Sequence, residues 1–314
     1  LITKYGGANS WGGLTVDEER GWVFASTGSP SFDFYGGYRK GMNLFGNCIL
    51  ALDATTGERQ WHYQTVHHDL WDYDNPPAPL LVTINKEGEK KDAVVQFTKM
   101  GLTFVLDRDT GEPLFPIIET PVPPSTVEGE EAWPTQPIPT KPAPLTRLGL
   151  SQTDLTNIAS RNRDYAEREV ANYLSGGLFT PPSEMGTIAQ PGTFGGVEWH
   201  GGAFDPYTNI VYVNSNDAPG LLKLKKTFEP TGEAHLSDIQ RGQIIYERNC
   251  TICHGLDRKG LSPIFPSVLK LEKTEEDISA WIRTGGSIMP AFAQFTEKEL
   301  AQLSKYMRSD DVEA

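Results

Sequence analysis

The turn L-D-x-x-T-G-x-x-x-aromatic occurs twice in this sequence, and it constrains the fold more than any other feature. It stands in ALDATTGERQW (51–61) and in VLDRDTGEPLF (105–115), with Asp53 and Asp107 54 residues apart. Asp and Thr side chains can cap a tight turn, Gly takes a positive φ, and the aromatic residue can then pack between neighbouring units. A period of about 40–55 residues with Gly and aromatic punctuation is typical of β-propeller blades.

A second frame (a small residue, an Asp, a turn and strand residues) links GLTVDEERGWVF (13–24) with GAFDPYTNIVYV (202–213). Short strand-like runs such as CILALD, VVQFT and LTFVLD are separated by turn signals. The sequence therefore predicts an all-β unit over 1–220. The nine prolines between 116 and 144 leave open a polyproline II linker or an ordered excursion over a blade, which the interleaved apolar residues favour. Residues 151–174 are interpreted as a helical insertion.

Composition excludes some classes of function. The net charge of −13 over 314 residues argues against a nucleic-acid surface, which needs clustered Lys and Arg. The sequence contains no run of about 18 apolar residues, so no segment is predicted to span a membrane. Three cysteines are too few for a disulfide framework. Cys48, in the strand-like FGNCILALD, is interpreted as a buried small hydrophobe rather than a reactive thiol.

The pattern changes after Asp217. Residues 221–236 are predicted to be a linker, and residues 237–314 a compact, mostly helical domain. Capping-box spacing marks three helix starts in that domain, at Ser237/Gln240, Thr274/Asp277 and Thr296/Glu299.

The helical domain carries the motif C-x-x-C-H. Cys250 and Cys253 have the spacing that lets two thiols attach the two vinyl groups of a haem, and His254 supplies an imidazole to the iron. Redox or zinc chemistry is the alternative, but a zinc site needs two more nearby ligands, and the sequence offers none. We therefore expect a covalent haem c.

This domain resembles class I mono-haem cytochrome c over about 75 residues. The resemblance implies that Met289, in SIMPAF, is the sixth ligand of the haem iron, whereas Met307 is core. It implies that the carbonyl of Pro266 or, less favoured, Pro263 orients His254. Where the first and last helices cross, Gly242 and Tyr246 are expected to face Leu303 and Tyr306.

The stretch HHDLWDYD (67–74) is strongly acidic and follows a strand-like run. It lies among motifs that resemble the propeller of pyrroloquinoline-quinone (PQQ) dehydrogenases, nearest the branch of membrane-bound glucose dehydrogenase. These motifs are GSPSFDFYGGYRKGMN (28–43), ALDATTGERQWHYQTVHHDLWDYD (51–74), TKMGLTFVLDRDTGEPLF (98–115), PTQPIPTKPAP (134–144) and GGVEWHGGAFDPYTNIVYVN (195–214). The resemblance implies an incomplete eight-bladed β-propeller fused to a small all-α class I cytochrome c domain.

The same resemblance implies roles for individual residues. In that family a hydride passes from an alcohol or sugar C–H to PQQ while a carboxylate removes the hydroxyl proton. Asp72 matches the base, and Lys99 matches the cation that polarises the quinone oxygens. Asp33 is the local candidate for a ligand of the Ca²⁺ that holds PQQ. Glu198 and Trp199 match cofactor neighbours, and Glu198 stands where alcohol dehydrogenases of the family usually have Asn.

Two residues of the acidic stretch receive a structural interpretation. Asp69 and His68 are expected to hold the loop by hydrogen bonds, and His67 and Asp74 receive no role. A complete propeller of this kind has eight blades, and about half are visible. We expect the chain to be clipped at both ends, the alternative being blades supplied by another chain.

The sequence therefore predicts part of a PQQ-dependent dehydrogenase of a sugar, polyol or alcohol that passes electrons to haem c. The expected acceptor is a soluble cytochrome, a copper protein or a terminal oxidase. Haem c attachment predicts an exported, periplasmic bacterial protein. Two alternatives stay open: an electron-transfer or scaffold protein whose propeller binds no quinone, and a fragment in which only the cytochrome domain is functional.

Overall fold

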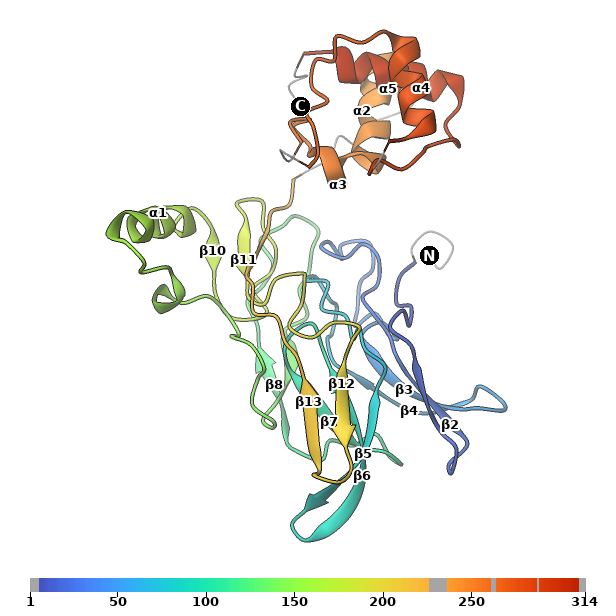
Figure 1. The fold of residues 1–314 in the computed structure, drawn as a ribbon, viewed down its shortest axis with the longest axis vertical. Helices are drawn as coiled ribbons and strands as arrows, with labels where there is room; N and C mark the ends of the chain where they lie inside the picture. Colours follow the sequence, from blue (N-terminus) through green and yellow to red (C-terminus); the bar gives the residue numbers. More distant parts are fainter. Residues whose placement is uncertain (1–5, 226–235, 261–263, 287, 311–314) are drawn as a thin grey trace. The chain divides into compact units, whose positions relative to one another are not determined.

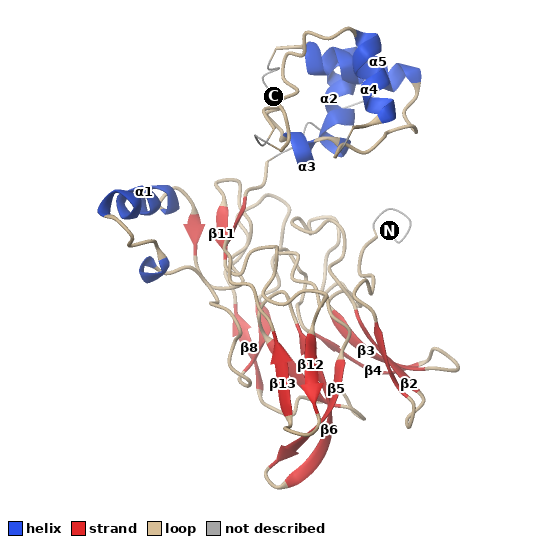
Figure 2. Ribbon diagram, in the orientation of Figure 1, coloured by secondary structure: helices blue, strands red, loops and turns tan. Residues whose placement is uncertain are grey.

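A computed structural model describes residues 6–225, 236–260, 264–286 and 288–310. The chain divides into two compact units, Leu1–Leu224 and Lys225–Ala314. The first unit holds the strands and the second is helical (Figures 1 and 2). The point of division lies within the predicted linker 221–236, of which residues 226–235 fall outside the described residues.

The first unit begins with a four-stranded antiparallel sheet in the order β1-β2-β3-β4. These strands are β1 (Leu14–Asp17), β2 (Trp22–Ser26), β3 (Cys48–Asp53) and β4 (Arg59–Gln64). Each strand pairs with the next one in the chain, which is the arrangement of a propeller blade. Cys48 is fully buried in β3, and burial raises the pKa of its thiol to about 12, as expected of a core residue.

A second antiparallel sheet and a two-stranded ribbon repeat this design. The sheet runs β5-β6-β7 and the ribbon pairs β12 with β13. β5 contacts both β1 and β12, which places the two sheets and the ribbon side by side (Figure 1). The bounds are β5 (Leu80–Lys86), β6 (Glu89–Phe97), β7 (Thr103–Asp107), β12 (Gly202–Asp205) and β13 (Ile210–Val213).

The repeated turn has the predicted geometry. Asp53 Oδ1 accepts from the backbone N–H groups of Thr55 and Thr56 at 2.8 Å, and Asp107 Oδ1 accepts from those of Asp109 and Thr110 at 3.0 Å. The turn glycines have φ of +75° and +72°. Asp205 caps the β12–β13 turn in the same way. These caps are local, which is why the motif could be read from sequence.

The aromatic residue of the repeat packs against the next unit, as predicted. Trp61 in β4 donates from Nε1 to the carbonyl of Arg108 at 3.0 Å, and its ring covers Gly111 in the turn after β7. A Cβ on Gly111 would lie 2.5 Å from the Trp61 ring. The second turn is therefore the docking site for the tryptophan that follows the first turn.

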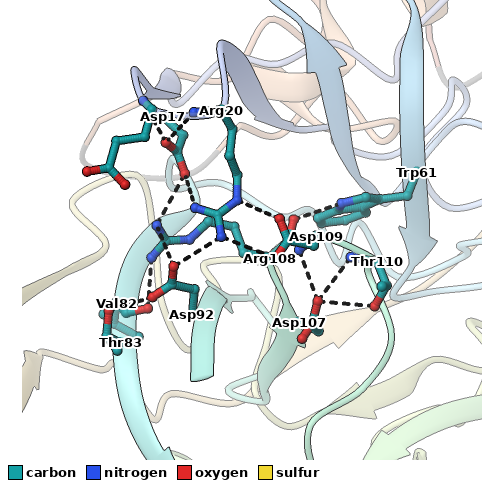
Figure 3. Close-up of polar contacts among 11 residues, drawn as sticks. Asp17, Arg20, Trp61, Val82, Thr83, Asp92, Asp107, Arg108, Asp109 and Thr110 are labelled. Carbon is teal, nitrogen blue, oxygen red and sulfur yellow. Dashed lines mark hydrogen bonds and ion pairs between the residues drawn. The ribbon is translucent and has the colours of Figure 1, made fainter. Parts of the chain in front are cut away.

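Charged residues reinforce this contact between sheets (Figure 3). Arg20, in the turn between β1 and β2, pairs with Asp17 at 3.0 Å, with Asp92 of β6 at 3.0 Å and with Asp109 at 2.6 Å. Arg108 also pairs with Asp17, at 3.2 Å. Because several donors of each guanidinium are used, this network holds the first two sheets together more firmly than isolated surface pairs would.

The proline-rich segment is ordered, which confirms the favoured interpretation. β8 (Ile117–Pro121) and β9 (Thr135–Pro139) pair antiparallel, and Ile117 and Ile138 pack against the main core. The helical insertion is shorter than predicted. It comprises a 3-10 turn at Gln152–Asp154 and α1 (Ser160–Val170), because Leu155 and Ala159 are extended between them. A small sheet of three strands completes the unit: β10 (Leu174–Ser175), β11 (Thr187–Ala189) and β14 (Gly220–Leu222).

The helical unit contains four described helices around its own core. The three predicted caps are present: the side chains of Ser237, Thr274 and Thr296 each accept from the backbone N–H three residues on. The helices are α2 (Asp238–Asn249), α3 (Thr251–His254), α4 (Glu275–Thr284) and α5 (Glu297–Arg308).

The crossing of α2 and α5 confirms the expected contacts. A Cβ on Gly242 would lie 2.0 Å from the carbonyl oxygen of Gln302, so only glycine permits this approach. The rings of Tyr246 and Tyr306 lie 5.4 Å apart, and Leu303 is fully buried in the same cluster. Met307 is also buried there, as predicted for a core residue.

The predicted fold class is therefore confirmed: an incomplete β-propeller followed by a small helical domain of the cytochrome c kind. The sheets of the described residues do not close into a ring. None of the helices in the described ranges is long and apolar enough to cross a lipid bilayer.

The two turn glycines offer a matched test of the tryptophan contact. Gly57→Ala should cost roughly 1–2 kcal/mol, because Ala is strained at positive φ but meets nothing within 4 Å. Gly111→Ala should cost about 1–3 kcal/mol more, because its Cβ collides with Trp61. Urea unfolding followed by tryptophan fluorescence measures the loss in free energy of unfolding for both variants. Equal losses would show that the packing of Trp61 against Gly111 does not contribute to stability.

Candidate functional site

The acidic stretch 67–74 follows β4 and is organised by one buried carboxylate. Asp69 is 0% exposed. One of its oxygens accepts from the backbone N–H of Trp71, and the other accepts from the N–H of Tyr73, the amide of Asn47 and the hydroxyl of Ser29. These bonds turn the chain so that Asp72 adopts a φ of +60°. The expectation that Asp69 holds the loop is confirmed.

The two histidines fasten the loop to the proline-rich segment. His68 bonds the carbonyl of Gly41 through Nδ1 and the carboxylate of Glu130 through Nε2, both at 2.8 Å. The backbone N–H and carbonyl of His67 are both bonded by the amide of Gln136. The expected structural role of His68 is therefore confirmed, and His67 has the same kind of role.

The loop brings Asp72 and Asp74 to Lys99, which follows β6. The Lys99 Nζ lies 2.9 Å from Asp72 Oδ2 and 3.1 Å from Asp74 Oδ2. Lys99 is only 7% exposed. β4 and β6 both end at the edge opposite the aspartate-capped turns, because the strands of each sheet are antiparallel. The structure thus assembles a carboxylate–ammonium–carboxylate cluster at one edge.

The environment perturbs both members of the predicted pair. Burial raises the pKa of Asp72 to about 7, with Asp74 and Asp69 adding to the effect and Lys99 opposing it. Burial by itself would lower the pKa of Lys99, but the carboxylates of Asp72 and Asp74 outweigh it and raise that pKa. Asp72 is therefore able to accept and release a proton near neutral pH, while Lys99 stays a cation.

Other predicted residues lie around this cluster. Asp33 is exposed as a whole residue, yet partial burial of its carboxyl raises its pKa, and the charges of Asp74 and Asp69 raise it further. Glu198 lies beside Lys99, because a Cβ on Gly195 would touch both side chains. Trp199 is 68% exposed and stacks edge-on with His200. The roles of Asp33, Glu198 and Trp199 in cofactor binding stay predictions.

Sequence reasoning missed two residues of the site. Asp74 received no role, yet it binds Lys99. Because Asp72 has a positive φ, strand alternation does not apply along D-Y-D, and no local pattern predicts that both carboxylates face the lysine. Glu130, the partner of His68, lies in the proline-rich segment 62 residues along the chain. No local pattern connects it to the loop.

The motif C-x-x-C-H spans the end of α2 and the short helix α3. Cys250 and Cys253 are free thiols, and His254 is buried. The Nδ1 of His254 lies 2.9 Å from the carbonyl oxygen of Pro266. A carbonyl only accepts hydrogen bonds, so Nδ1 carries the proton and Nε2 keeps its lone pair for a metal. This confirms Pro266 as the orienting residue; Pro263 lies outside the described residues.

Met289 lies at the margin of the helical core, partly buried. Its carbonyl accepts from the N–H of Gly286 at 2.9 Å, which fixes the turn after α4. Within the ranges that the structure describes, no group of three or more His, Cys, Asp and Glu side chains is arranged to hold a metal. Two free thiols, an oriented imidazole and a thioether are the groups that a covalently bound haem uses.

Fold and site together define a quinoprotein dehydrogenase propeller joined to a cytochrome c domain. The family model of the glucose/ethanol/alcohol dehydrogenase β-propeller domain matches residues 2–253. The model of the cbb3-type cytochrome C oxidase subunit III matches residues 237–307. The chain belongs to the PQQ β-propeller family of glucose, ethanol and alcohol dehydrogenases.

Curated relatives agree with this assignment. The chain is 37% identical over 215 residues to the quinate/shikimate dehydrogenase (quinone) of Acinetobacter baylyi, covering 68% of this chain and 27% of that protein. It is 37% identical over 223 residues to the quinoprotein glucose dehydrogenase of Escherichia coli, covering 69% and 27%. The chain thus spans about a quarter of the length of these relatives.

A solved structure shares the fold over nearly the whole chain. A quinohemoprotein alcohol dehydrogenase from Pseudomonas putida superposes with a TM-score of 0.54 at 17% identity, covering 96% of this chain and 64% of its own. At this identity the similarity supports the fold alone.

The perturbed Asp72 should be visible in the pH dependence of stability. Between pH 4 and 7 the folded state binds a proton at Asp72 that the unfolded state, with an ordinary pKa of 3.8, does not. The free energy of unfolding should therefore fall with rising pH by up to roughly 1.4 kcal/mol per unit. Asp72→Asn should remove this component in urea unfolding measured from pH 4 to 8.

Asp53→Asn is the control for that measurement. The turn hydrogen bonds lower the pKa of Asp53, so its contribution is lost only as the pH falls below about 4. Asp53→Asn should leave the change of the free energy of unfolding with pH between 4 and 7 as it is in the wild type. If Asp72→Asn also leaves it unchanged, Asp72 titrates as an ordinary surface carboxylate.

Proposed function

We propose that the full-length protein is a periplasmic PQQ-dependent dehydrogenase that oxidises a CH–OH group of a sugar, polyol or alcohol and passes the electrons to haem c. The contact between Asp72 and Lys99 carries this proposal. A buried acid with a pKa of about 7 beside a lysine fits a general base and an electrophilic cation.

Asp72 would accept the hydroxyl proton of the substrate. A base works best when its pKa is near the working pH, and burial brings Asp72 to about 7. Its side chain is partly open to solvent, so a substrate hydroxyl can reach it. PQQ supplies the two-electron acceptor for the substrate hydride when it is bound.

Lys99 would face the quinone oxygens. Its ammonium is a point charge held by two carboxylates, and it stays protonated because these outweigh its burial. The centroid of the Trp11 ring lies 6.0 Å from Nζ. Glu198 beside Lys99 would line the same space, which supports its assignment near the cofactor despite the departure from Asn.

Asp33 would supply an oxygen ligand to Ca²⁺. Its donor chemistry fits, because the carboxyl lies near the negative charges of Asp74 and Asp69, and a divalent cation would relieve their repulsion. The described residues offer no preassembled group of three ligands. The remaining ligands would therefore come from elsewhere in the complete protein.

The cytochrome domain would hold the haem through Cys250 and Cys253, with His254 and Met289 as the iron ligands. His/Met ligation favours a high reduction potential, and the haem supplies a one-electron carrier. The carbonyl of Pro266 keeps His254 oriented for this task. A soluble cytochrome, copper protein or terminal oxidase would accept the electron next.

The names of the relatives support polyhydroxylated substrates. They include dehydrogenases of glucose, of quinate and shikimate, and of glycerol. The periplasm follows from the chemistry of haem c attachment, which takes place outside the cytoplasm. The rival function is an electron-transfer scaffold whose propeller binds no quinone; the buried Asp72–Lys99 pair weighs against it, because a scaffold has no need of that cluster.

The visible spectrum of the full-length protein tests the proposal. Oxidised protein with PQQ and Ca²⁺ should develop reduced c-type haem bands when a mixture of sugars, polyols and alcohols is added. Asp72→Asn should slow that reduction by at least about a hundredfold, the effect expected for loss of a general base. Stopped-flow absorbance measures the rate.

Asp205→Asn is the matched control, because Asp205 is a turn carboxylate in the same domain that lies outside the acidic stretch 67–74. It should leave the rate unchanged. A haem that dithionite reduces but no substrate does, in protein that retains PQQ, would favour the scaffold.

Two methionines test the haem ligation. Met289→Leu should abolish the absorbance band of sulfur ligation and lower the reduction potential, because the axial thioether is lost. Met307→Leu, a near volume-conserving change in the buried core, should keep the spectrum and cost less than about 1.5 kcal/mol. Visible spectroscopy and redox titration of the haem protein measure both. Loss of the band in Met307→Leu instead would reverse the assignment.

A further inference from the structure

Asp74 makes more contacts with Lys99 than the predicted base does. Its carboxylate binds Lys99 Nζ at 3.1 Å, and its backbone carbonyl accepts from the Lys99 N–H at 3.1 Å. The other carboxylate oxygen accepts from the N–H of Ser29, after β2. Asp74 therefore ties together the chain segments that follow β2, β4 and β6, with the lysine at the junction.

The space around Asp74 is closed. A Cβ on Gly28 would lie 2.5 Å from Asp74 Oδ1, and Asp74 is itself buried. The carboxylate thus has a fixed position between the Gly28–Ser29 backbone and Lys99. Contacts on two sides fix the position of the Asp74 carboxylate, as expected of a group that must hold a functional side chain in place.

A second carboxylate has a chemical consequence for the pair. If Lys99 bound Asp72 alone, the ammonium would form one ion pair with the base and stabilise its anion, which makes a poorer proton acceptor. A lysine shared by two carboxylates neutralises each of them less. It also has a partner left when Asp72 takes up a proton and becomes neutral.

We propose that Asp74 is a positioning residue of the site: it anchors the ammonium of Lys99 beside Asp72 and keeps it anchored when Asp72 is protonated. This inference rests on the proposed function only where it concerns turnover. The contact by which Asp74 anchors Lys99 does not depend on that function.

The surrounding charges are consistent with this role. Asp69 faces the same cluster, but its carboxylate oxygens accept hydrogen bonds from two backbone N–H groups, the Ser29 hydroxyl and the Asn47 amide. Glu198 lies beside the lysine stem, and Asp33, in the segment after β2, interacts electrostatically with Asp74, Asp69 and Lys99. Of these carboxylates in the described part of the chain, Asp72 and Asp74 form ion pairs with Lys99.

Competitive acetylation of the full-length protein tests the proposal without PQQ or substrate. Acetic anhydride reacts with unprotonated amines, and mass spectrometry compares Lys99 with the more exposed Lys91 between pH 8 and 11. Asp74→Asn should speed acetylation of Lys99 by about tenfold, the effect of roughly one pKa unit. Asp74→Glu keeps the charge and should stay within about threefold of wild type.

The outcomes separate positioning from simple packing. If Asp74 acted only by packing, both variants would speed the acetylation of Lys99. Asp74→Glu would then have the larger effect, because the longer side chain disturbs the closed pocket more. Equal acceleration in the two variants, or none in Asp74→Asn, overturns the proposal. Thermal unfolding of each variant shows whether the fold is intact.

Asp72→Asn provides a second test if Asp74→Asn does not fold. With Asp74 as the remaining partner, Lys99 should still react at least about tenfold more slowly than Lys91. A rate equal to that of Lys91 overturns the proposal.

Turnover then links the residue to the reaction. In full-length protein with PQQ, Asp74→Asn should lower kcat and move the acidic limb of the pH profile to lower pH, because Asp72 loses a negative neighbour. Lack of turnover in the wild type would refute the proposed function alone, since the acetylation result does not depend on it.

Discussion

The fully buried carboxylate of Asp69 is the interaction on which the site depends. A buried charge is tolerated only when hydrogen bonds replace its water, and Asp69 receives them from two backbone N–H groups of its own loop and from Ser29 and Asn47. These donors lie after β2, before β3 and after β4. The carboxylate therefore fixes the loop that carries Asp72 and Asp74 and joins it to the first sheet.

The proline-rich segment gives this loop its second support. Glu130 meets His68, and Gln136 bonds both backbone groups of His67, so 116–144 works as a clamp rather than as a linker. Prolines suit this segment because they lower the conformational entropy of the unfolded chain, so that less entropy is lost when the segment becomes ordered. The positive φ of Asp72 is a local strain, and such strain persists only where surrounding contacts over-determine the backbone. Here those contacts come from both sides of the loop.

Sequence reasoning succeeded where the physics is local. The aspartate-capped turns, the three helix caps and the His254 environment each depend on residues within a few positions or on a strong motif. It also brought Asp72 and Lys99 together through resemblance. It failed for Asp74 and Glu130, whose partners are set by which strands become neighbours. The predicted length of the 151–174 helix was wrong because the extended residues Leu155 and Ala159 interrupt it. Helix propensity alone does not determine where such an interruption falls.

The two edges of the propeller unit explain this division. Antiparallel strands place the turns around Asp17, Asp53 and Asp107 at one edge, where the Arg20 network and Trp61 bind neighbouring sheets together. The same strands place Ser29, Asp72 and Lys99 at the other edge, after β2, β4 and β6. At the first edge the same turn motif recurs and stabilises the contacts between sheets, so each repeat can be recognised in the sequence on its own. At the second edge each unit contributes a different residue to the candidate site, so the site forms only once the sheets have packed. A change at the turns should therefore reach the site only by altering how the sheets align, which makes the turn aspartates suitable controls for the acidic loop.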